Sequence, residues 1–182
     1  MICLQETWHQ RGSTANTTVD GYESDFNSQN EWRGNGIATF YWNGFKRTNA
    51  SVWSKHFQIT TMEKSGIFFL NVYYKGSSEK TFIDCLGQIS SIMTNAMNRF
   101  NSNDLSFMIM GDFNIDSLKD NNRILLWLKA QNLVQVVQRP THIMGGLIDH
   151  VWITRDLIPR VTVRQKGVFF SDHDMITITL TP

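Results

Sequence analysis

The stretch at residues 107–116, FMIMGDFNID, decides how the rest of the chain is interpreted. Its first four residues are apolar and uninterrupted, which is typical of a short strand buried on both faces. Gly111 ends this run, and a glycine there lets the backbone turn sharply or come close to a ligand. Asp112 and Asn114 lie two positions apart, so they point to the same side while the chain stays extended. The stretch therefore predicts a carboxylate and a carboxamide together at the rim of a sheet. An ordinary turn rich in Asp and Asn is the alternative from this stretch alone.

Length and composition limit the class of protein. The chain has 182 residues, 41% of them apolar, and we expect a single domain over residues 1–182. A net charge of +1 excludes a dedicated nucleic-acid coat protein, so any contact with DNA must rely on local charge and geometry. Two cysteines, Cys3 and Cys85, form neither a disulfide framework nor a zinc pattern. Without a long apolar run or a basic leader, the sequence predicts an intracellular protein with no membrane association.

Many strands and two helices are predicted along the chain. An amphipathic helix is expected over residues 79–100, where apolar residues recur every three or four positions, with Ser78 as its N-cap. A shorter helix is expected over residues 121–130. Asn43 and Gly44 predict a hairpin turn. Together these elements predict two packed sheets with helices outside. Strands are expected at residues 2–4, 36–41, 57–61, 67–73, 107–110, 134–137, 148–154, 161–165 and 175–180.

Four short segments place acidic or imidazole groups directly after an apolar run. Each lies at a predicted strand end, where loops on a rigid scaffold carry function. Carboxylate and amide oxygens without a cysteine suit a hard divalent cation, Mg²⁺ or Mn²⁺, rather than zinc. A neighbouring histidine can act as an acid, a base or a cation beside negative charge. The segments are LQE at residues 4–6, GDFN at 111–114, LIDHVWI at 147–153 and FFSDHD at 169–174.

Each segment also has a purely structural explanation. Glu6 alone is typical of a surface residue that closes a strand, Asp149 and His150 of a solvated strand edge, and SDHD of a turn cap. The occurrence of all four segments in this order favours a functional site. Three further histidines have no patterned neighbours and are interpreted as ordinary surface or core residues: His9, His56 and His142.

With NVY at residues 71–73, the order LQE, NVY, GDFN, IDH and SDH resembles the endonuclease/exonuclease/phosphatase superfamily. Within it, NLVQVVQRPTHIMGGLIDHVWIT at residues 132–154 is most similar to the endonuclease domain of non-LTR retrotransposons, and RGNGIATFY at 33–41 is similar to that group's glycine-bearing strand. The resemblance spans residues 2–180. It implies an α+β fold of the deoxyribonuclease I-like type, a four-layer α/β/β/α sandwich.

The resemblance also implies a metal site and an attacking water. It gives Glu6 and Asp172 to a divalent metal, Mg²⁺ or Mn²⁺, with Asp172 assisting the metal or the water. It gives Asp112 and Asn114 the task of positioning the attacking water and the scissile phosphate.

The remaining roles that the resemblance implies concern the phosphate. His173 contacts a phosphate oxygen while Asp149 orients its imidazole, and Tyr73 hydrogen-bonds the phosphate. Thr141 and Ser171 are expected to be supporting hydrogen-bond donors to the substrate.

Two departures from the family pattern stand out. Members of the family begin with a strand ending in Asn and then a helix, whereas this chain begins inside the LQE strand. The expected fold therefore lacks its first strand–helix unit and an Asn ligand. After Tyr73 the family has Pro-Asn two positions on, where this chain has Lys75 and Gly76. From these departures we predict that the polypeptide has weak activity or none.

The function that the resemblance implies is nicking of DNA by a retrotransposon-type endonuclease. A reverse transcriptase domain in a longer parent protein and a nuclear location are the matching expectations. One alternative is a phosphatase or phosphodiesterase of the same fold acting on a small phosphorylated substrate, although no dense Lys/Arg cluster lies near the motifs. The other is a non-catalytic remnant of a mobile element that binds nucleic acid or a partner without turnover.

Overall fold

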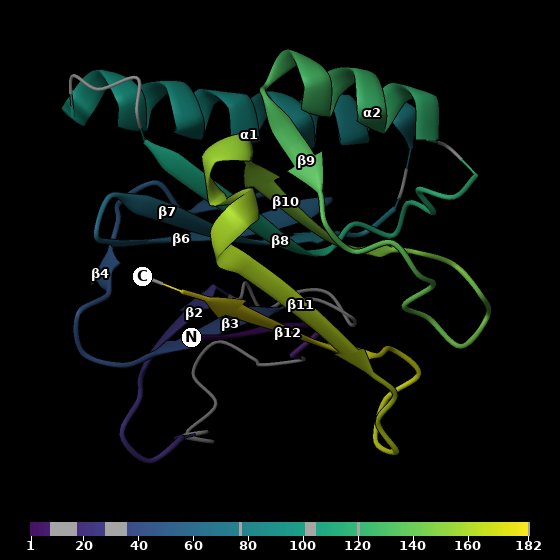
Figure 1. Cartoon of the computed structure of the whole chain (residues 1–182), viewed down its shortest axis with the longest axis horizontal. Helices are drawn as coiled ribbons and strands as arrows, with labels where there is room; N and C mark the ends of the chain where they lie inside the picture. The colour runs from purple at the N-terminus through teal and green to yellow at the C-terminus, as the bar shows by residue number, and fades with distance from the viewer. Residues whose placement is uncertain (8–17, 28–35, 77, 101–104, 120, 182) are drawn as a thin grey trace.

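The computed structural model describes residues 1–7, 18–27, 36–76, 78–100, 105–119 and 121–181 (Figure 1). Both predicted helices are confirmed at their predicted ends, and each predicted strand is found within a few residues of its expected bounds. His9 lies outside the described residues. The elements in chain order are β1 (Ile2–Gln5), β2 (Glu23–Asn27), β3 (Ile37–Tyr41), β4 (Lys46–Arg47), β5 (Val52–Trp53), β6 (Phe57–Lys64), β7 (Ile67–Tyr74), α1 (Glu79–Phe100), β8 (Ser106–Asp112), α2 (Asn121–Ala130), β9 (Leu133–Gln135), β10 (Asp149–Thr154), the 3₁₀ helix η1 (Arg155–Arg160), β11 (Val161–Lys166) and β12 (Met175–Leu180).

A seven-stranded sheet forms the centre of the molecule. Its strand order is β4-β6-β7-β8-β10-β9, with β5 also paired to β6. Only the pairing of β7 with β8 is parallel, because α1 carries the chain from one strand back to the start of the next. Ser78 caps α1 as predicted, since its Oγ accepts the backbone N–H of Thr81 at 3.3 Å. No helix in the described part of the chain is both long enough and apolar enough to span a membrane.

Helices and a second β layer cover opposite faces of this sheet. Both α1 and α2 lie on one face, while the β1-β3-β2 sheet and the β11-β12 hairpin lie on the other (Figure 1). The α+β prediction and the packing of two β layers are confirmed. The described residues supply three of the four expected layers, one of helices and two of strands.

Two hydrophobic cores fill the spaces between these layers. In β7, alternate side chains serve the two cores: Leu70 packs under the helices and Phe69 packs between the β layers. Trp152 and Ile89 belong to the core beneath the helices. Met108 and Ile153 belong to the core between the β layers. Burial on both faces explains why β7, β8 and β10 have almost unbroken apolar sequences.

The Asn-Gly signal predicts a hairpin, and this prediction is wrong. The turn itself forms, with the Phe45 N–H donating to the Trp42 carbonyl at 3.4 Å and Gly44 at φ 98°. However, β3 before the turn pairs with β1 and β2, whereas β4 after it pairs with β6. The turn therefore carries the chain from the second β layer to the central sheet.

A buried polar network ties the two β layers together at Asn71. Its Nδ2 donates to the Ala38 carbonyl at 3.0 Å and to Thr39 Oγ1 at 3.1 Å, while Gln5 Nε2 donates to its Oδ1 at 2.5 Å. Asn71 is only 1% exposed, so these bonds satisfy an amide that burial would otherwise make costly. The Asn of the NVY segment thus holds β1 and β3 against β7.

Gly111 is required by the close approach of two strands. It has φ 141°, and a Cβ added there would lie 1.8 Å from the carbonyl oxygen of Val72 in β7. The sequence predicts a sharp turn or a close approach to a ligand at this glycine, whereas the structure shows a close approach to the backbone of β7. This tight contact sets Asp112, the next residue, at the edge of the sheet.

Candidate active site

Three predicted site residues lie side by side where strands β7 and β8 end and the antiparallel strand β10 begins. In the central sheet, Tyr73 of β7 lies opposite Asp112 of β8, and Asp112 lies opposite Asp149 of β10. Asp112 and Asp149 are both buried, at 4% and 9% exposed. Two carboxylates directly opposite each other repel, so this arrangement requires a compensating positive charge.

His173 supplies one positive charge. It precedes β12, and its Nδ1–H donates to Asp149 Oδ2 at 2.8 Å. This hydrogen bond raises the pKa of His173 to about 9, and the charges of Asp149 and Asp112 add to the effect. The imidazole is therefore a cation at neutral pH, and the predicted pairing of His173 with Asp149 is confirmed as a contact.

The negative charge of Asp112 is less well neutralised than that of Asp149, because the imidazolium of His173 is hydrogen-bonded to Asp149. Burial raises its pKa to about 7, and the neighbouring charge of Asp149 contributes in the same direction. The backbone N–H of Asn114 donates to Asp112 Oδ1 at 2.8 Å and opposes part of this rise. At neutral pH this carboxyl group is consequently poised between its acid and base forms.

Asn114 is fixed beside Asp112 by its amide nitrogen. Its Nδ2 donates to Asp112 Oδ2 at 3.1 Å and to the Tyr74 carbonyl at 2.9 Å, and its backbone has φ 47°. Since both partners are acceptors, the amide oxygen must face away from them. The predicted carboxylate and carboxamide therefore do lie side by side at the rim of the sheet.

Glu6 approaches this edge from the second β layer. It follows β1 at φ 50°, and its Oε1 accepts the Tyr73 hydroxyl at 2.7 Å. Burial and this hydrogen bond raise the pKa of the Tyr73 phenol, so the hydroxyl stays protonated. The hydroxyl proton is directed to Glu6, and a bond from Tyr73 to a phosphate stays a prediction.

Thr141 and Ser171 act as hydrogen-bond acceptors in this structure, whereas the sequence predicts donors to a substrate. Thr141 is 1% exposed, and its Oγ1 accepts the backbone N–H groups of Ile148 at 3.2 Å and Asp149 at 3.0 Å. Ser171 Oγ accepts the backbone N–H of His173 at 3.0 Å. Both hydroxyls thus support residues of the charged pair, and substrate contact by either one stays a prediction.

Asp172 lies beside His142, and its predicted role at the metal together with Glu6 stays a prediction. Its side chain is 66% exposed, and its Oδ2 lies 3.3 Å from His142 Nε2. A hydrogen bond from its own backbone N–H and the bond to His142 hold the pKa of Asp172 below its ordinary value. His142, interpreted from sequence as an ordinary histidine, therefore belongs to the site. In the sequence, the one feature that links His142 to the site is its position directly after Thr141, a predicted site residue.

His150 belongs to the core instead. Adjacent residues of a strand point to opposite faces, so the side chain after Asp149 turns toward the helices. His150 is fully buried and stacks on Phe113, with ring centroids 5.0 Å apart and an interplanar angle of 17°. Burial lowers its pKa to about 4, so the ring is neutral, and its Nε2–H donates to the carbonyls of Ile115 and Leu147. The segment at residues 147–153 thus contributes Asp149 alone.

The donor set of the site suits a hard divalent cation. One group of candidate ligand atoms, all within 4.8 Å of one another, comes from Asp112, Asp149 and His173, but the His173 ring is a protonated donor to Asp149. Glu6 lies near enough for its charge to raise the pKa of Asp112. Buried carboxylates outnumber the single imidazolium, and a divalent cation would relieve that repulsion through oxygen ligands.

A second group of close ligand atoms fits a metal poorly. It comprises His142, Asp172 and His173. His142 Nδ1 accepts the backbone N–H of Met144 at 3.1 Å, which places the ring proton on Nε2, the atom that faces Asp172. A protonated nitrogen cannot ligate a metal. This group is therefore a hydrogen-bonded link between two loops.

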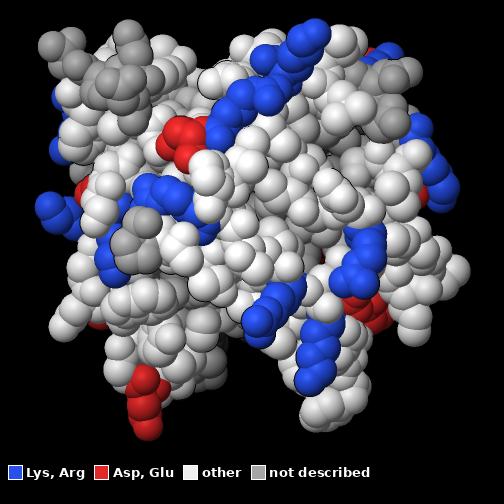
Figure 2. Space-filling view, in the orientation of Figure 1, with Lys and Arg blue, Asp and Glu red and all other residues white. Residues whose placement is uncertain are grey.

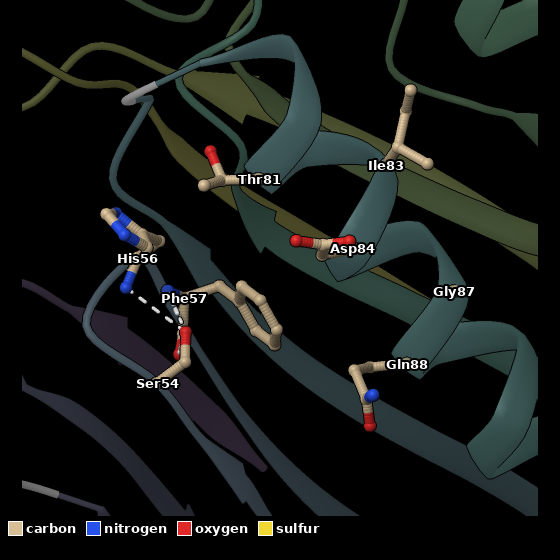
Figure 3. Close-up of a pocket in the computed structure, with 8 residues that line it drawn as sticks. All are labelled: Ser54, His56, Phe57, Thr81, Ile83, Asp84, Gly87 and Gln88. Carbon is tan, nitrogen blue, oxygen red and sulfur yellow. Dashed lines mark hydrogen bonds between the residues drawn. The ribbon is translucent and has the colours of Figure 1, made fainter.

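One hollow of the described surface lies beside α1 and does not contain the charged cluster. That hollow, of about 580 Å³, lies between α1 and the segment that enters β6, and Figure 3 shows Asp84 and Gln88 of α1 across from His56. None of its lining residues belongs to the cluster. The candidate site lies instead where β7 and β8 end and β10 begins.

Several solved structures share this fold, although no curated protein matches the sequence. The endonuclease domain of TRAS1, a telomere-specific non-LTR retrotransposon, matches with a TM-score of 0.66 and 14% identity over 90% of this chain and 80% of that one. The 3′-5′ exonuclease NExo from Neisseria meningitidis matches with a TM-score of 0.70 and 16% identity, over 98% and 88%. An AP endonuclease from Archaeoglobus fulgidus matches with a TM-score of 0.63 and 17% identity, over 98% and 87%. At these identities the likeness is one of fold.

The sequence itself gives the family. The Endonuclease/Exonuclease/phosphatase family model matches residues 1–173, which include every predicted site residue from Glu6 to His173. Because this match covers far more than half of the sequence, the chain belongs to the Endonuclease/Exonuclease/phosphatase family, whose enzymes hydrolyse phosphodiester bonds and depend on a divalent metal.

Proposed function

We propose that this protein is a Mg²⁺- or Mn²⁺-dependent endonuclease that nicks DNA, of the kind found in non-LTR retrotransposons. The observation that carries the proposal is the meeting of Asp112 with the Asp149–His173 pair at one edge of the central sheet. These groups combine a carboxyl of raised pKa with a fixed cation. Both are needed to hydrolyse a phosphodiester, where a nucleophile is deprotonated while negative charge grows on the phosphoryl group.

In this mechanism His173 stabilises the negative charge that grows on the phosphoryl group. Because Asp149 holds its Nδ1–H, the ring orientation is fixed and Nε2–H is left to donate to a phosphoryl oxygen. With a pKa of about 9, the ring keeps its proton at neutral pH. Thr141 helps to hold Asp149 in place, since its Oγ1 accepts the backbone N–H of Asp149.

Asp112 and Asn114 act on the attacking water. The Asp112 carboxylate, which is ionised when a cation is bound, can accept a hydrogen bond from that water and orient it. The Asn114 amide oxygen, which faces away from Asp112, is placed to orient that water. Glu6 and Asp112 are the residues that would hold the divalent cation, which when bound supplies charge neutralisation and a more acidic water.

Three observations support DNA rather than a small phosphorylated compound as the substrate. Among the described residues, the only positively charged member of the site is His173, whereas a multiply charged head group calls for several cations. The sequence at residues 132–154 is similar to retrotransposon endonucleases, and TRAS1 shares the fold. A reverse transcriptase domain in a longer parent protein and a nuclear location belong to the same proposal.

A plasmid-nicking assay tests the proposal. Supercoiled plasmid is incubated with the protein in Mg²⁺ or in EDTA, and with inositol phosphates in parallel. We expect Mg²⁺-dependent nicking that falls by about 10² or more in Asp112→Ala and His173→Ala, because each removes a positioned acid–base or charge-stabilising group. Asp84→Ala, which removes an exposed carboxylate from the hollow of Figure 3, is the matched control.

The same assay separates the alternatives. Near-normal nicking by both Asp112→Ala and His173→Ala overturns the site assignment, and turnover of inositol phosphates alone overturns the choice of substrate. Robust nicking by the unaltered chain refutes the sequence-based prediction of weak activity.

A further inference from the structure

Two phenylalanines next to the site are fully presented to solvent. Phe169 is 98% exposed and Phe170 is 74% exposed, and their rings form an edge-to-face pair with centroids 5.3 Å apart. They lie in the loop that joins β11 to β12, which projects beyond the strands in Figure 1. Neither ring adds to a hydrophobic core, so folding gains nothing from their burial. Exposed aromatic groups of this kind mark an interaction surface.

The base of this loop is held in place while its tip projects. The backbone N–H of Asp174 donates to the Thr141 carbonyl at 2.7 Å, and Gln165 Nε2 donates to Asp174 Oδ2 at 2.8 Å. His173 forms an isolated β-bridge with His142. These contacts fix the loop at its C-terminal end, three residues after Phe170. Phe170 is three residues before His173, so the chain between them spans at most about 11 Å, and a ligand that rests on the two rings can extend to the His173 imidazole.

The hairpin that leads to this loop carries two cations on its exposed face, while the loop itself carries Asp172 and Asp174. The exposed face of the β11–β12 hairpin carries Arg164 and Lys166 opposite Thr177 and Met175, and no acidic residue. Figure 2 shows basic side chains, with acidic ones beside them, over the part of the molecule where Figure 1 draws these strands. Lys166 ends β11 immediately before the loop begins. A polyanion is thus favoured along the hairpin, and aromatic faces are available where the hairpin ends.

We propose that the Phe169–Phe170 pair is a stacking platform for an unpaired nucleic-acid base. The protein then prefers DNA in which a base beside the cleaved phosphate is unpaired over an intact duplex. Stacking on aromatic rings depends little on base identity, because every base has a π face. In an intact duplex the bases stack on one another, so the rings reach a base only at the cost of unstacking it. The proposal rests on the proposed function and adds to it the form of DNA that the protein selects.

Binding measured without metal tests this inference apart from catalysis. Two oligonucleotide duplexes carry 2-aminopurine at the same position in EDTA, one fully paired and one with that base in a short mismatched bubble. We expect the unaltered protein to bind the bubble at least about tenfold more tightly than the paired duplex and to change the 2-aminopurine fluorescence. In the double variant Phe169→Ala/Phe170→Ala, we expect bubble affinity to fall by about tenfold and duplex affinity to change less than twofold.

Matched variants isolate the stacking contribution. Leu126→Ala removes a 68% exposed apolar side chain from α2 and should leave both affinities unchanged. Lys166→Gln should weaken binding to both duplexes equally and reduce the salt dependence. Equal affinity of the unaltered protein for the two duplexes, an equal loss on both in the double variant, or no loss at all overturns the inference. Plasmid nicking without a bubble preference leaves the proposed function standing, whereas a bubble preference without nicking removes that function alone.

Discussion

His142 and Asp172, thirty positions apart in the chain, are joined by a hydrogen bond of 3.3 Å from imidazole Nε2 to carboxylate Oδ2. The backbone repeats this link, since the Ile143 N–H donates to the Asp172 carbonyl at 2.9 Å. The loop at residues 141–146 and the loop that carries His173 are therefore held together at two levels. Their separation in sequence means that only folding creates this contact.

Replacing His142 should show whether the link positions His173. In His142→Gln, the side-chain amide nitrogen takes the place of Nε2 and can still donate to Asp172, but nothing replaces Nδ1 as the acceptor of the Met144 N–H. In His142→Asn, the side-chain oxygen takes the place of Nδ1, but the amide nitrogen does not reach Asp172. We expect His142→Gln to keep near-normal turnover and His142→Asn to lose about two- to fivefold in kcat, since a largely exposed pair contributes little. KM and melting temperature should stay unchanged in both. Steady-state nicking kinetics make the comparison, and equal kcat values for the two variants contradict a positioning role.

Asp112→Asn should make the protein more stable and less active. The ionised carboxylate is costly in this site, and the raised pKa of about 7 means that stability is lost as pH rises from about 4 through 7. Removing the charge should raise the free energy of unfolding at pH near 8 in EDTA. The gain should be only on the order of 1 kcal/mol, because the variant also loses one hydrogen bond from Asn114, and that loss offsets part of the relief. The gain should vanish near pH 5, where the native carboxyl is protonated.

Urea denaturation at the two pH values measures this effect, with Asp84→Asn as an exposed control. A variant that is less stable than the unaltered protein near pH 8 would show that the hydrogen bonds of Asp112 outweigh its charge repulsion.

Thr141→Val should destabilise the fold although it preserves the shape of the side chain. The backbone N–H groups of Ile148 and Asp149 both donate to Thr141 Oγ1, and valine leaves two buried donors unpaired. We expect a loss of roughly 2–4 kcal/mol in the free energy of unfolding. Thr141→Ser retains the oxygen and should recover most of that loss. A Thr141→Val variant as stable as the unaltered protein would contradict a stabilising role for the two hydrogen bonds to Thr141 Oγ1.

Local patterns predicted much of this fold because local physics determines them. The apolar periodicity and the Ser78 cap define α1 at both ends, and unbroken apolar runs define β7, β8 and β10. Polar groups at strand ends indicated four candidate segments, and the family resemblance selected Asp112, Asp149 and His173 within them. Which sheet a strand joins is decided by tertiary packing, so the Asn-Gly turn was predicted as a hairpin although β3 and β4 separate.

The histidines show the same limit within the site. Asp149 and His150 are adjacent in a strand, so only one of them could face the site, and strand alternation alone does not say which. The partner of His142 lies thirty positions away across a loop-to-loop contact that no local pattern encodes. Glu6 and Asp172 share a predicted role, yet their nearest partners are Tyr73 and His142, which belong to different segments.

Divalent cations should stabilise the protein through Asp112. A ligand that binds only the folded state raises stability in proportion to the logarithm of its concentration over Kd. We expect Mg²⁺ and Mn²⁺ to raise the melting temperature at pH near 8, with the shift lost in Asp112→Asn and kept in His142→Asn. Thermal unfolding followed by circular dichroism measures this without any substrate. Equal shifts in all three proteins would place the cation elsewhere.

The buried imidazole of His150 should limit stability in acid. Burial lowers its pKa to about 4 from an ordinary value of 6.5. The unfolded chain therefore takes up a proton as pH falls below 6.5 while the folded chain does not, and stability is lost between these two values. The expected loss is roughly 3 kcal/mol by pH 4. Gln does not titrate and can still donate to the carbonyls of Ile115 and Leu147, so His150→Gln should lack this loss.

Urea denaturation of both proteins from pH 7.5 down to about 4.5 isolates the contribution of His150, because every other titrating group is shared. Parallel pH profiles would mean that the ring is already protonated in the folded protein, which is incompatible with a neutral imidazole stacked on Phe113.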